Sequence, residues 1–175
     1  MKKNALKEQI AKGTQCLNGW VAVPNGFQAE TYAAQGWDSV TIDMQHGSND
    51  INDIVPLLQA IQLAGPTAMV RVPWNEPGSI MRVLDAGAYG VICPMINTKA
   101  EAEAFAAAGR YPPMGARSNG PFRASQYAGA DYLKGANDEI LLFAMIETRE
   151  ALKNLDAILK RSEEHTSELQ SRQYL

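Results

Sequence analysis

A regular alternation between short apolar segments and longer segments of helical periodicity begins at Leu17 and constrains the fold more than any other feature. Such alternation is typical of βαβ units, in which consecutive strands form a parallel sheet. The predicted strands cover residues 17–23, 39–43, 68–72, 90–95 and 140–146. The predicted fold class is therefore α/β with parallel strands.

Helices are predicted between these strands, and a glycine follows each of the four predicted helices. The helical segments cover residues 27–34, 49–63, 78–84 and 99–108 and are followed by Gly36, Gly65, Gly87 and Gly109. Glycine readily adopts the left-handed conformation that ends many helices. Asn49 and Thr98 are the expected N-caps, and residues 6–10 form a short amphipathic helix ahead of the first strand.

Residues 109–135 interrupt the alternation because their prolines and glycines do not continue a helix or a central strand. We expect a long loop that contains a short helix near residues 126–133. Loops of this length commonly serve binding or subunit contacts. The arginines of this loop, Arg110, Arg117 and Arg123, have either such a role or a solvated position on an exposed loop.

The chain is too short for a complete barrel of βα units. A closed (β/α)8 barrel needs about 250 residues, whereas the recognised units occupy residues 17–160. The sequence therefore predicts an incomplete TIM barrel of about five βα units, formed by residues 1–160. Residues 161–175 show no pattern of a sixth strand, and residues 161–172 resemble a translated sequencing adapter. We expect a tail foreign to the domain, with a genuine disordered terminus as the alternative.

Composition excludes several kinds of partner. A formal charge of -3, from 16 basic and 19 acidic residues, gives no footprint for nucleic acid or an anionic membrane surface. No apolar run suits a membrane span or a signal peptide, and the 2 cysteines are too few for a disulfide framework. We expect a cytoplasmic protein whose partners are small molecules.

Polar residues end several of the predicted strands abruptly. Asp43 and His46 follow the second strand, Arg71 ends the third, and Glu147 follows the fifth. The carboxyl ends of the strands form the active-site face of a parallel barrel. The sequence thus places an acid, an imidazole, a guanidinium and a carboxylate on one rim.

Each of these residues also has a structural alternative. Glu147 suits the first turn of the following helix, where backbone amides are unpaired, and His46 suits a tight structural turn. Arg71 is a plausible ion-pair partner for Asp43, and Asp43 suits a role in orienting neighbouring backbone. The tryptophans Trp20, Trp37 and Trp74 are interpreted as packing residues rather than as a stacking site.

A series of short motifs is specific in its combination and order. The motifs are Asp43-Met44-Gln45-His46-Gly47, Arg71-Val72-Pro73, Leu84-Asp85-Ala86-Gly87-Ala88, Ile92-Cys93-Pro94-Met95, Arg110-Tyr111-Pro112-Pro113-Met114-Gly115 and Glu147-Thr148. Over about residues 13–160 the chain resembles the HpcH/HpaI aldolase family, cut off after about residue 160.

The resemblance implies a class II, metal-dependent lyase of the kind used in aromatic compound catabolism. Such an enzyme reversibly cleaves 4-hydroxy-2-oxo acids, for example 4-hydroxy-2-oxoheptanedioate, to pyruvate and an aldehyde. A Glu after strand five and an Asp after strand six hold a divalent ion, for which Mg²⁺, Mn²⁺ and Co²⁺ are candidates. Glu147 matches the first ligand and a position at the substrate, whereas the second ligand is missing from this chain. A homo-oligomer is expected for the full-length protein.

The roles of the remaining residues follow from the chemistry of the cleavage and from the resemblance. Breaking the C3–C4 bond leaves negative charge on the pyruvyl half, and Arg71 is expected to bind the substrate and stabilise that charge. His46 is the expected base for the 4-hydroxyl proton. Asp43 and, by resemblance, Asp85 orient the imidazole, with Asp85 acting across a subunit boundary.

Two alternatives stay open. One is a non-catalytic barrel fragment with exposed strand edges and apolar surface. The other is an acyl-CoA lyase of the citrate-lyase β type, against which the combination of His46 and Arg71 favours the aldolase branch. Because the second metal ligand is missing, we expect residues 1–175 by themselves to show little aldolase turnover.

Overall fold

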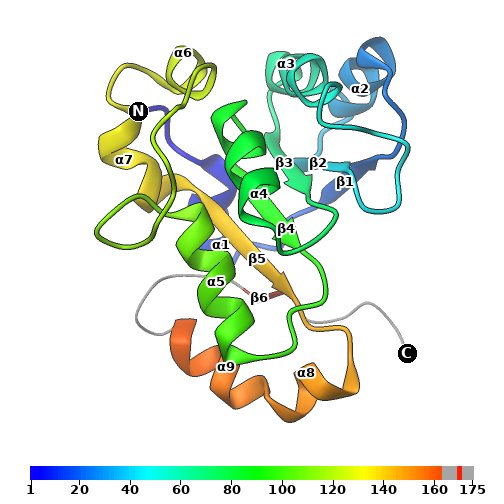
Figure 1. The fold of residues 1–175 in the computed structure, drawn as a ribbon. Helices are drawn as coiled ribbons and strands as arrows, with labels where there is room; N and C mark the ends of the chain where they lie inside the picture. Colours follow the sequence, from blue (N-terminus) through cyan, green and yellow to red (C-terminus); the bar gives the residue numbers. More distant parts are fainter. Residues whose placement is uncertain (163–168, 171–175) are drawn as a thin grey trace.

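The computed structural model describes residues 1–162 and 169–170, which contain one parallel sheet. Each strand pairs with the next one along the chain, in the order β1-β2-β3-β4-β5-β6 (Figure 1). The strands are β1 (Asn18–Val21), β2 (Ser39–Asp43), β3 (Thr67–Arg71), β4 (Gly90–Cys93), β5 (Leu141–Met145) and β6 (Leu169–Gln170). The first five confirm the predicted parallel sheet.

The two-residue strand β6 differs from the expectation that residues 161–175 contain no strand. Leu169 and Gln170 pair in parallel with Ala144 and Met145 of β5. Strand pairing uses backbone groups that every residue except proline carries. A strand of only two residues therefore leaves no recognisable pattern in the sequence. The rest of the tail, residues 163–168 and 171–175, lies outside the described residues, and the domain boundary at residue 160 stays a prediction.

Helices follow the first five strands, and most of them cover one face of the sheet. The helices are α1 (Ala5–Ala11), α2 (Gly26–Ala33), α3 (Ile54–Ala64), α4 (Pro77–Asp85), α5 (Lys99–Gly109), α6 (Ala124–Ala128), α7 (Tyr132–Glu139), α8 (Arg149–Lys153) and α9 (Leu155–Ser162). In the described part of the chain, no helix has both the length and the apolar character that crossing a bilayer requires.

Most predicted helix ends are confirmed. Gly36, Gly65 and Gly87 have positive φ angles after α2, α3 and α4, whereas Gly109 is the last residue of α5. Thr98 begins α5 through a capping box with Glu101, in which each side chain accepts a hydrogen bond from the other residue's backbone amide.

The prediction that Asn49 caps α3 is wrong. Asp53 precedes the helix instead. The buried side chain of Asn49 donates hydrogen bonds to the carbonyls of Val21 and Asp43. Asn49 therefore ties together the carboxyl ends of β1 and β2.

The predicted long loop is shorter and more buried than expected. Two helices, α6 and α7, occupy most of residues 124–139, where one short helix was expected. In the remaining loop Arg110 and Arg117 are buried, and Arg123 donates to the carbonyl of Ala86 and to Gln62 Oε1. The alternative of solvated arginines is therefore wrong for Arg110 and Arg117.

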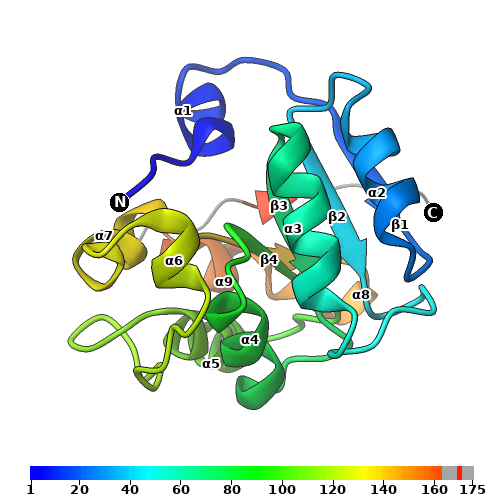
Figure 2. The same ribbon diagram turned by 90° about the horizontal axis from the view of Figure 1, so that it is seen from above.

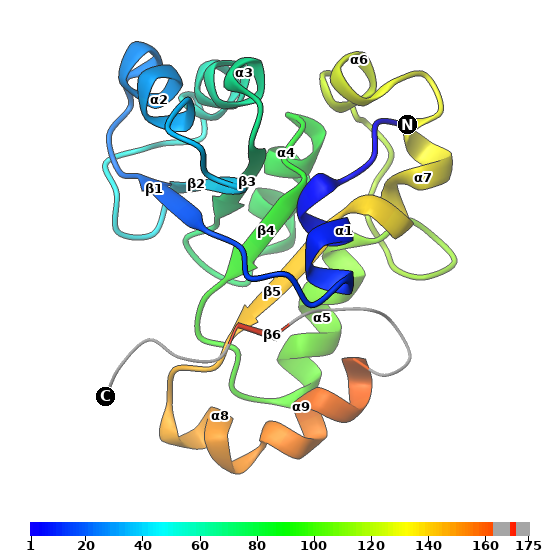
Figure 3. The same cartoon turned by 180° about the vertical axis from the view of Figure 1, so that it is seen from behind.

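Alternate side chains of the sheet enter two separate cores. On the outer face, residues such as Val70 and Leu142 pack against the helical layer. On the inner face, Met69, Ile92, Leu141 and Phe143 pack against Leu6 of α1. Figures 1 and 3 show α1 on the face opposite α4 and α5, and Figure 2 shows it set apart from α3 and α4. Helix α1 thus covers the inner surface of an open barrel.

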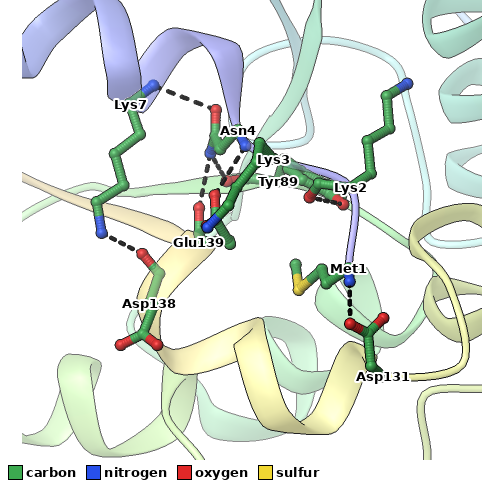
Figure 4. Close-up of polar contacts among 9 residues, drawn as sticks. All are labelled: Met1, Lys2, Lys3, Asn4, Lys7, Tyr89, Asp131, Asp138 and Glu139. Carbon is green, nitrogen blue, oxygen red and sulfur yellow. Dashed lines mark hydrogen bonds and ion pairs between the residues drawn. The ribbon is translucent and has the colours of Figure 1, made fainter.

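Asn4 anchors α1 to the sheet and is fully buried (Figure 4). Its amide group donates to the carbonyls of Tyr89 (3.0 Å) and Glu139 (2.8 Å), and its backbone amide donates to Glu139 Oε2 (2.8 Å). Lys3 pairs with Glu139, and the amino group of Met1 pairs with Asp131. These contacts hold the start of the chain against the amino ends of β4 and β5.

The two edges of the sheet stay separate in the part of the chain that is described. β1 lies at one edge and β6 at the other. Parallel strands with helices outside and an apolar inner face are the arrangement of a (β/α)8 barrel. The predicted incomplete TIM barrel is therefore confirmed.

Candidate functional site

Asp43 and Arg71 form the centre of the site at the carboxyl edge of the sheet. They end β2 and β3 and lie directly opposite each other in the strand register. Arg71 Nε donates to Asp43 Oδ1 over 3.0 Å, and Arg71 Nη2 donates to Asp43 Oδ2 over 2.6 Å. Both residues are buried. The guanidinium is therefore held in one plane by a two-point contact.

The same carboxylate also organises the turn that carries His46. Asp43 Oδ1 accepts hydrogen bonds from the backbone amides of Gln45 (3.0 Å) and His46 (3.2 Å). Burial raises the pKa of Asp43, but the hydrogen bonds from Arg71 and from these amides outweigh burial and hold the pKa below its usual value. Asp43 is therefore ionised at neutral pH.

His46 is exposed beside this ion pair. Asp43 contacts the backbone of His46, and no hydrogen bond to the imidazole occurs among the described residues. The next residue is Gly47, where a Cβ atom would lie 2.3 Å from the carbonyl oxygen of Asp43 and 2.9 Å from that of Ala22. The turn thus needs glycine, and it presents His46 at the rim.

Trp20 packs against Arg71 at the rim, a partner that the packing interpretation of the tryptophans did not name. Its ring lies 4.6 Å from the guanidinium carbon of Arg71, and 36% of the residue is exposed. A guanidinium over an indole face is a favourable cation–π contact. Trp20 lies opposite Thr41 in the register, two residues before Asp43. The alternation of side chains along β1 and β2 was the available signal for this position.

Glu147 lies at the same edge of the sheet, after β5. It is exposed, and its Oε1 accepts a hydrogen bond of 2.7 Å from the backbone amide of Met95. The helix-capping alternative is wrong, because Thr148 caps α8 by accepting from Ala151. The carboxylate of Glu147 is thus presented by the β4 and β5 loops rather than bound to a helix end.

Asp85 lies apart from the other predicted site residues within this chain. It is the last residue of α4, which runs back from the end of β3 to the start of β4, so Asp85 lies toward the amino ends of the strands. Asp85 Oδ1 accepts a hydrogen bond of 2.7 Å from Arg117 Nη2. It lines an outer groove with Val55, Arg82 and Phe122. A role beside His46 would require a second subunit.

Two carboxylates lie at the carboxyl ends of the strands, and they differ in their surroundings. Arg71 engages both oxygens of the buried Asp43, whereas Glu147 is exposed and accepts from the Met95 amide through Oε1. Within residues 1–162 and 169–170, no group of three or more His, Cys, Asp and Glu side chains is placed to hold a metal ion. A hard divalent ion needs one or two protein carboxylates when substrate oxygens and water fill the other positions. The exposed carboxylate of Glu147 therefore fits one ligand position of such a site, and the described residues do not complete it.

The sequence profile of the HpcH/HpaI aldolase/citrate lyase family matches residues 18–167. The chain belongs to this family. A hydroxypyruvate/pyruvate aldolase of Rhizorhabdus wittichii is 48% identical over 148 residues, which are 85% of this chain and 59% of that protein. A 4-hydroxy-2-oxo-heptane-1,7-dioate aldolase of Salmonella dublin is 39% identical over 160 residues, which are 90% of this chain and 61% of that protein. The chain thus spans about three fifths of the length of these relatives.

Solved structures with 30% identity or more share the fold. An HpcH/HpaI aldolase/citrate lyase family protein from Burkholderia cenocepacia superposes with a TM-score of 0.82 at 33% identity, over 89% of this chain and 64% of that chain. Citrate synthase SbnG superposes with a TM-score of 0.79 at 30% identity, over 89% of this chain and 61% of that chain. The relatives named here include both aldolases and a synthase, so the site residues must decide between activities.

Proposed function

We propose that this chain carries the Asp43, His46, Arg71 and Glu147 part of the active site of a metal-dependent aldolase. The reaction is the reversible cleavage of a 4-hydroxy-2-oxo acid to pyruvate and an aldehyde. The observation that supports it most is the buried two-point contact between Asp43 and Arg71 at the carboxyl edge of the sheet. The aldolase names of the relatives with 48% and 39% identity favour this reaction over acyl-CoA cleavage.

Arg71 is the proposed substrate-binding cation. Asp43 engages Nε and Nη2, and Trp20 lies against the guanidinium. A cation fixed in this way loses little freedom when a substrate carboxylate or an enolate oxygen arrives. We therefore assign to Arg71 the stabilisation of negative charge that develops on the pyruvyl half when C3–C4 breaks.

His46 is the proposed base that removes the 4-hydroxyl proton. Histidine is the side chain that most often serves as a general acid or base towards a substrate hydroxyl. Asp43 orients the turn of His46 through the backbone amide, which is a positional rather than an electronic role. Asp85 is proposed to act on the imidazole only from a neighbouring subunit of a homo-oligomer.

Glu147 is the proposed protein ligand of a divalent ion, for which Mg²⁺, Mn²⁺ and Co²⁺ are candidates. When bound, such an ion supplies Lewis acidity that polarises the 2-oxo group. Glu147 contributes a carboxylate whose Oε1 is fixed by Met95. The second ligand, an Asp, belongs to a segment that residues 1–175 do not contain.

The proposal is tested by pyruvate release from 4-hydroxy-2-oxoheptanedioate with Mg²⁺, Mn²⁺ or Co²⁺. The assay uses residues 1–175 and a chain extended to the length of the relatives. We expect metal-dependent pyruvate formation by the extended chain and little by residues 1–175, which lack the proposed second ligand. An extended chain that folds but releases no pyruvate with any of these metals would refute the proposed function.

A further inference from the structure

The backbone of Met95 has an unusual conformation next to Glu147. Its φ angle is 57°, the only positive value at a residue other than glycine in the described part of the chain. Side chains with a Cβ rarely adopt this left-handed conformation because it costs free energy. Surrounding contacts must therefore hold the Met95 peptide in place, and its amide is the one that donates to Glu147 Oε1.

Asn97 provides these contacts. Its side-chain Nδ2 donates to the carbonyl of Met95 over 3.0 Å, and its Oδ1 accepts from the hydroxyl of Thr148. Its backbone amide donates to Glu101 Oε2 over 2.7 Å, and its carbonyl accepts from Asn154 Nδ2 over 2.9 Å. Asn97 is thus bonded to the β4 loop, the β5 loop, the start of α5 and the α8–α9 junction.

We infer that Asn97 is a positioning residue for Glu147. Asn97 holds the Met95 peptide in the left-handed conformation, and the Met95 amide then fixes one oxygen of the Glu147 carboxylate. The other oxygen, Oε2, has no hydrogen-bond partner among the described residues. The inference rests on the proposed function, because it takes Glu147 as a metal ligand.

The physical basis is the freedom of an exposed carboxylate. Glu147 lies in an exposed loop, where an unrestrained glutamate samples many rotamers, and ordering it costs conformational entropy on binding. Partners behind a ligand residue reduce this cost, and their loss typically lowers metal affinity about 10- to 100-fold. Asn97 reaches the carboxylate through one peptide, and its own hydrogen bonds connect that peptide to Glu101 of α5, to Thr148 and to Asn154.

The network is tested first without metal, by the amide resonance of Met95 in the nuclear magnetic resonance spectrum of residues 1–175. We expect Asn97→Ala and Glu147→Gln to shift this resonance upfield, because each weakens the Met95 hydrogen bond. Asn75→Ala is the matched control, since Asn75 Nδ2 donates to the carbonyl of Glu101 in the same helix α5 and has no bond to Met95. An unchanged Met95 resonance in Asn97→Ala would overturn the inference.

The second measurement is the Mn²⁺ affinity of the chain extended to the length of the relatives, in the presence of oxalate, followed by paramagnetic broadening of amide resonances near Glu147. We expect Asn97→Ala to weaken Mn²⁺ binding about 10-fold, and Asn75→Ala to stay within twofold of the wild type. Adding Met95→Gly to Asn97→Ala should restore most of the affinity, since glycine adopts positive φ without steric cost. A purely structural role of Asn97 predicts no such rescue.

The outcomes separate the two proposals. If Glu147→Gln keeps wild-type Mn²⁺ affinity in the extended chain, or the extended wild type binds no Mn²⁺, the metal role of Glu147 is refuted together with the inference. If Glu147→Gln weakens binding and Asn97→Ala does not, only the inference fails. Should Asn97→Ala not fold, Met95→Val replaces it, because a β-branched residue resists positive φ, and wild-type affinity in Met95→Val overturns the inference.

Discussion

Asp85 and Arg71 lie toward opposite ends of the parallel strands, although both belong to the predicted catalytic set. Arg71 lies at the carboxyl end of β3. Asp85 is the last residue of α4, the helix that returns the chain to the amino ends of the strands. Asp85 pairs there with Arg117, whose side chain is fully buried. Within one subunit Asp85 therefore holds the 110–123 loop against α4.

The first prediction follows from this pair. Replacing Asp85 by Asn leaves the buried guanidinium of Arg117 without its carboxylate, and removing one partner of a buried ion pair costs about 3 kcal/mol. We expect a loss of this order in the free energy of unfolding of residues 1–175, measured by urea titration. Glu103→Gln is the control, because it removes an exposed i,i+4 pair with Lys99 and should cost at most about 0.5 kcal/mol. Equal stability of both variants would contradict the anchoring role.

A second prediction concerns the fork-shaped contact of Arg71. Arg71→Lys keeps the charge but provides neither the two-point bond to Asp43 nor the planar contact with Trp20. In the extended chain we expect kcat/KM for aldol cleavage to fall about 100-fold, in the range seen when one oxyanion donor is removed. Arg82→Lys, at an exposed position in the outer groove, is the matched control. Arg71 loses its assigned role if both variants cleave at the wild-type rate.

The third prediction separates the base from the metal site. His46→Ala removes the proton acceptor, and the contribution of general base catalysis indicates a fall in kcat of about 100-fold or more. The exposed imidazole has no hydrogen bond among the described residues, so stability and Mn²⁺ affinity should stay unchanged. Normal turnover of His46→Ala in the extended chain would remove the assigned base.

The strands were predictable because buried parallel strands are short apolar runs, and β2 was predicted with its observed bounds. The polar ends of β2 and β3 were equally visible, since Asp43 and Arg71 interrupt apolar runs. The contact of Trp20 with Arg71 was missed because side-chain alternation shows only which face of the sheet Trp20 occupies, whereas the contact depends on how β1, β2 and β3 align.

Contacts between residues far apart in the sequence also could not be predicted from local sequence patterns. Asn49 lies four residues before Asp53 and looked like a helix cap. Its buried side-chain amide instead donates a hydrogen bond to the carbonyl of Val21, 28 positions away. Arg117 looked like a loop residue because its partner Asp85 lies 32 positions away. In both cases a local rule was overruled by a polar group that must be satisfied once buried.

The fourth prediction concerns the pH dependence of the α1 anchor. Burial raises the pKa of Glu139, but hydrogen bonds from Lys3 and the Asn4 backbone amide outweigh it, so the pKa lies below its usual value. A depressed folded-state pKa adds stability above the unfolded-state pKa of about 4.3, and this stability is lost as pH falls through the folded-state value. Glu139→Gln should therefore lose about 2 kcal/mol of unfolding free energy at pH 7, the size of a hydrogen bond to a charged group.

The same variant should approach the wild type at low pH, because the wild-type carboxylate is then protonated and neutral as well. Urea titrations at pH 7 and at the lowest pH where both proteins fold measure the difference directly. Asn4→Ala provides the comparison without a titrating group: it removes two buried hydrogen bonds to the carbonyls of Tyr89 and Glu139 and should destabilise at both pH values. A Glu139→Gln deficit that stays constant with pH would show that the anchor depends on shape and packing rather than on the charge of Glu139.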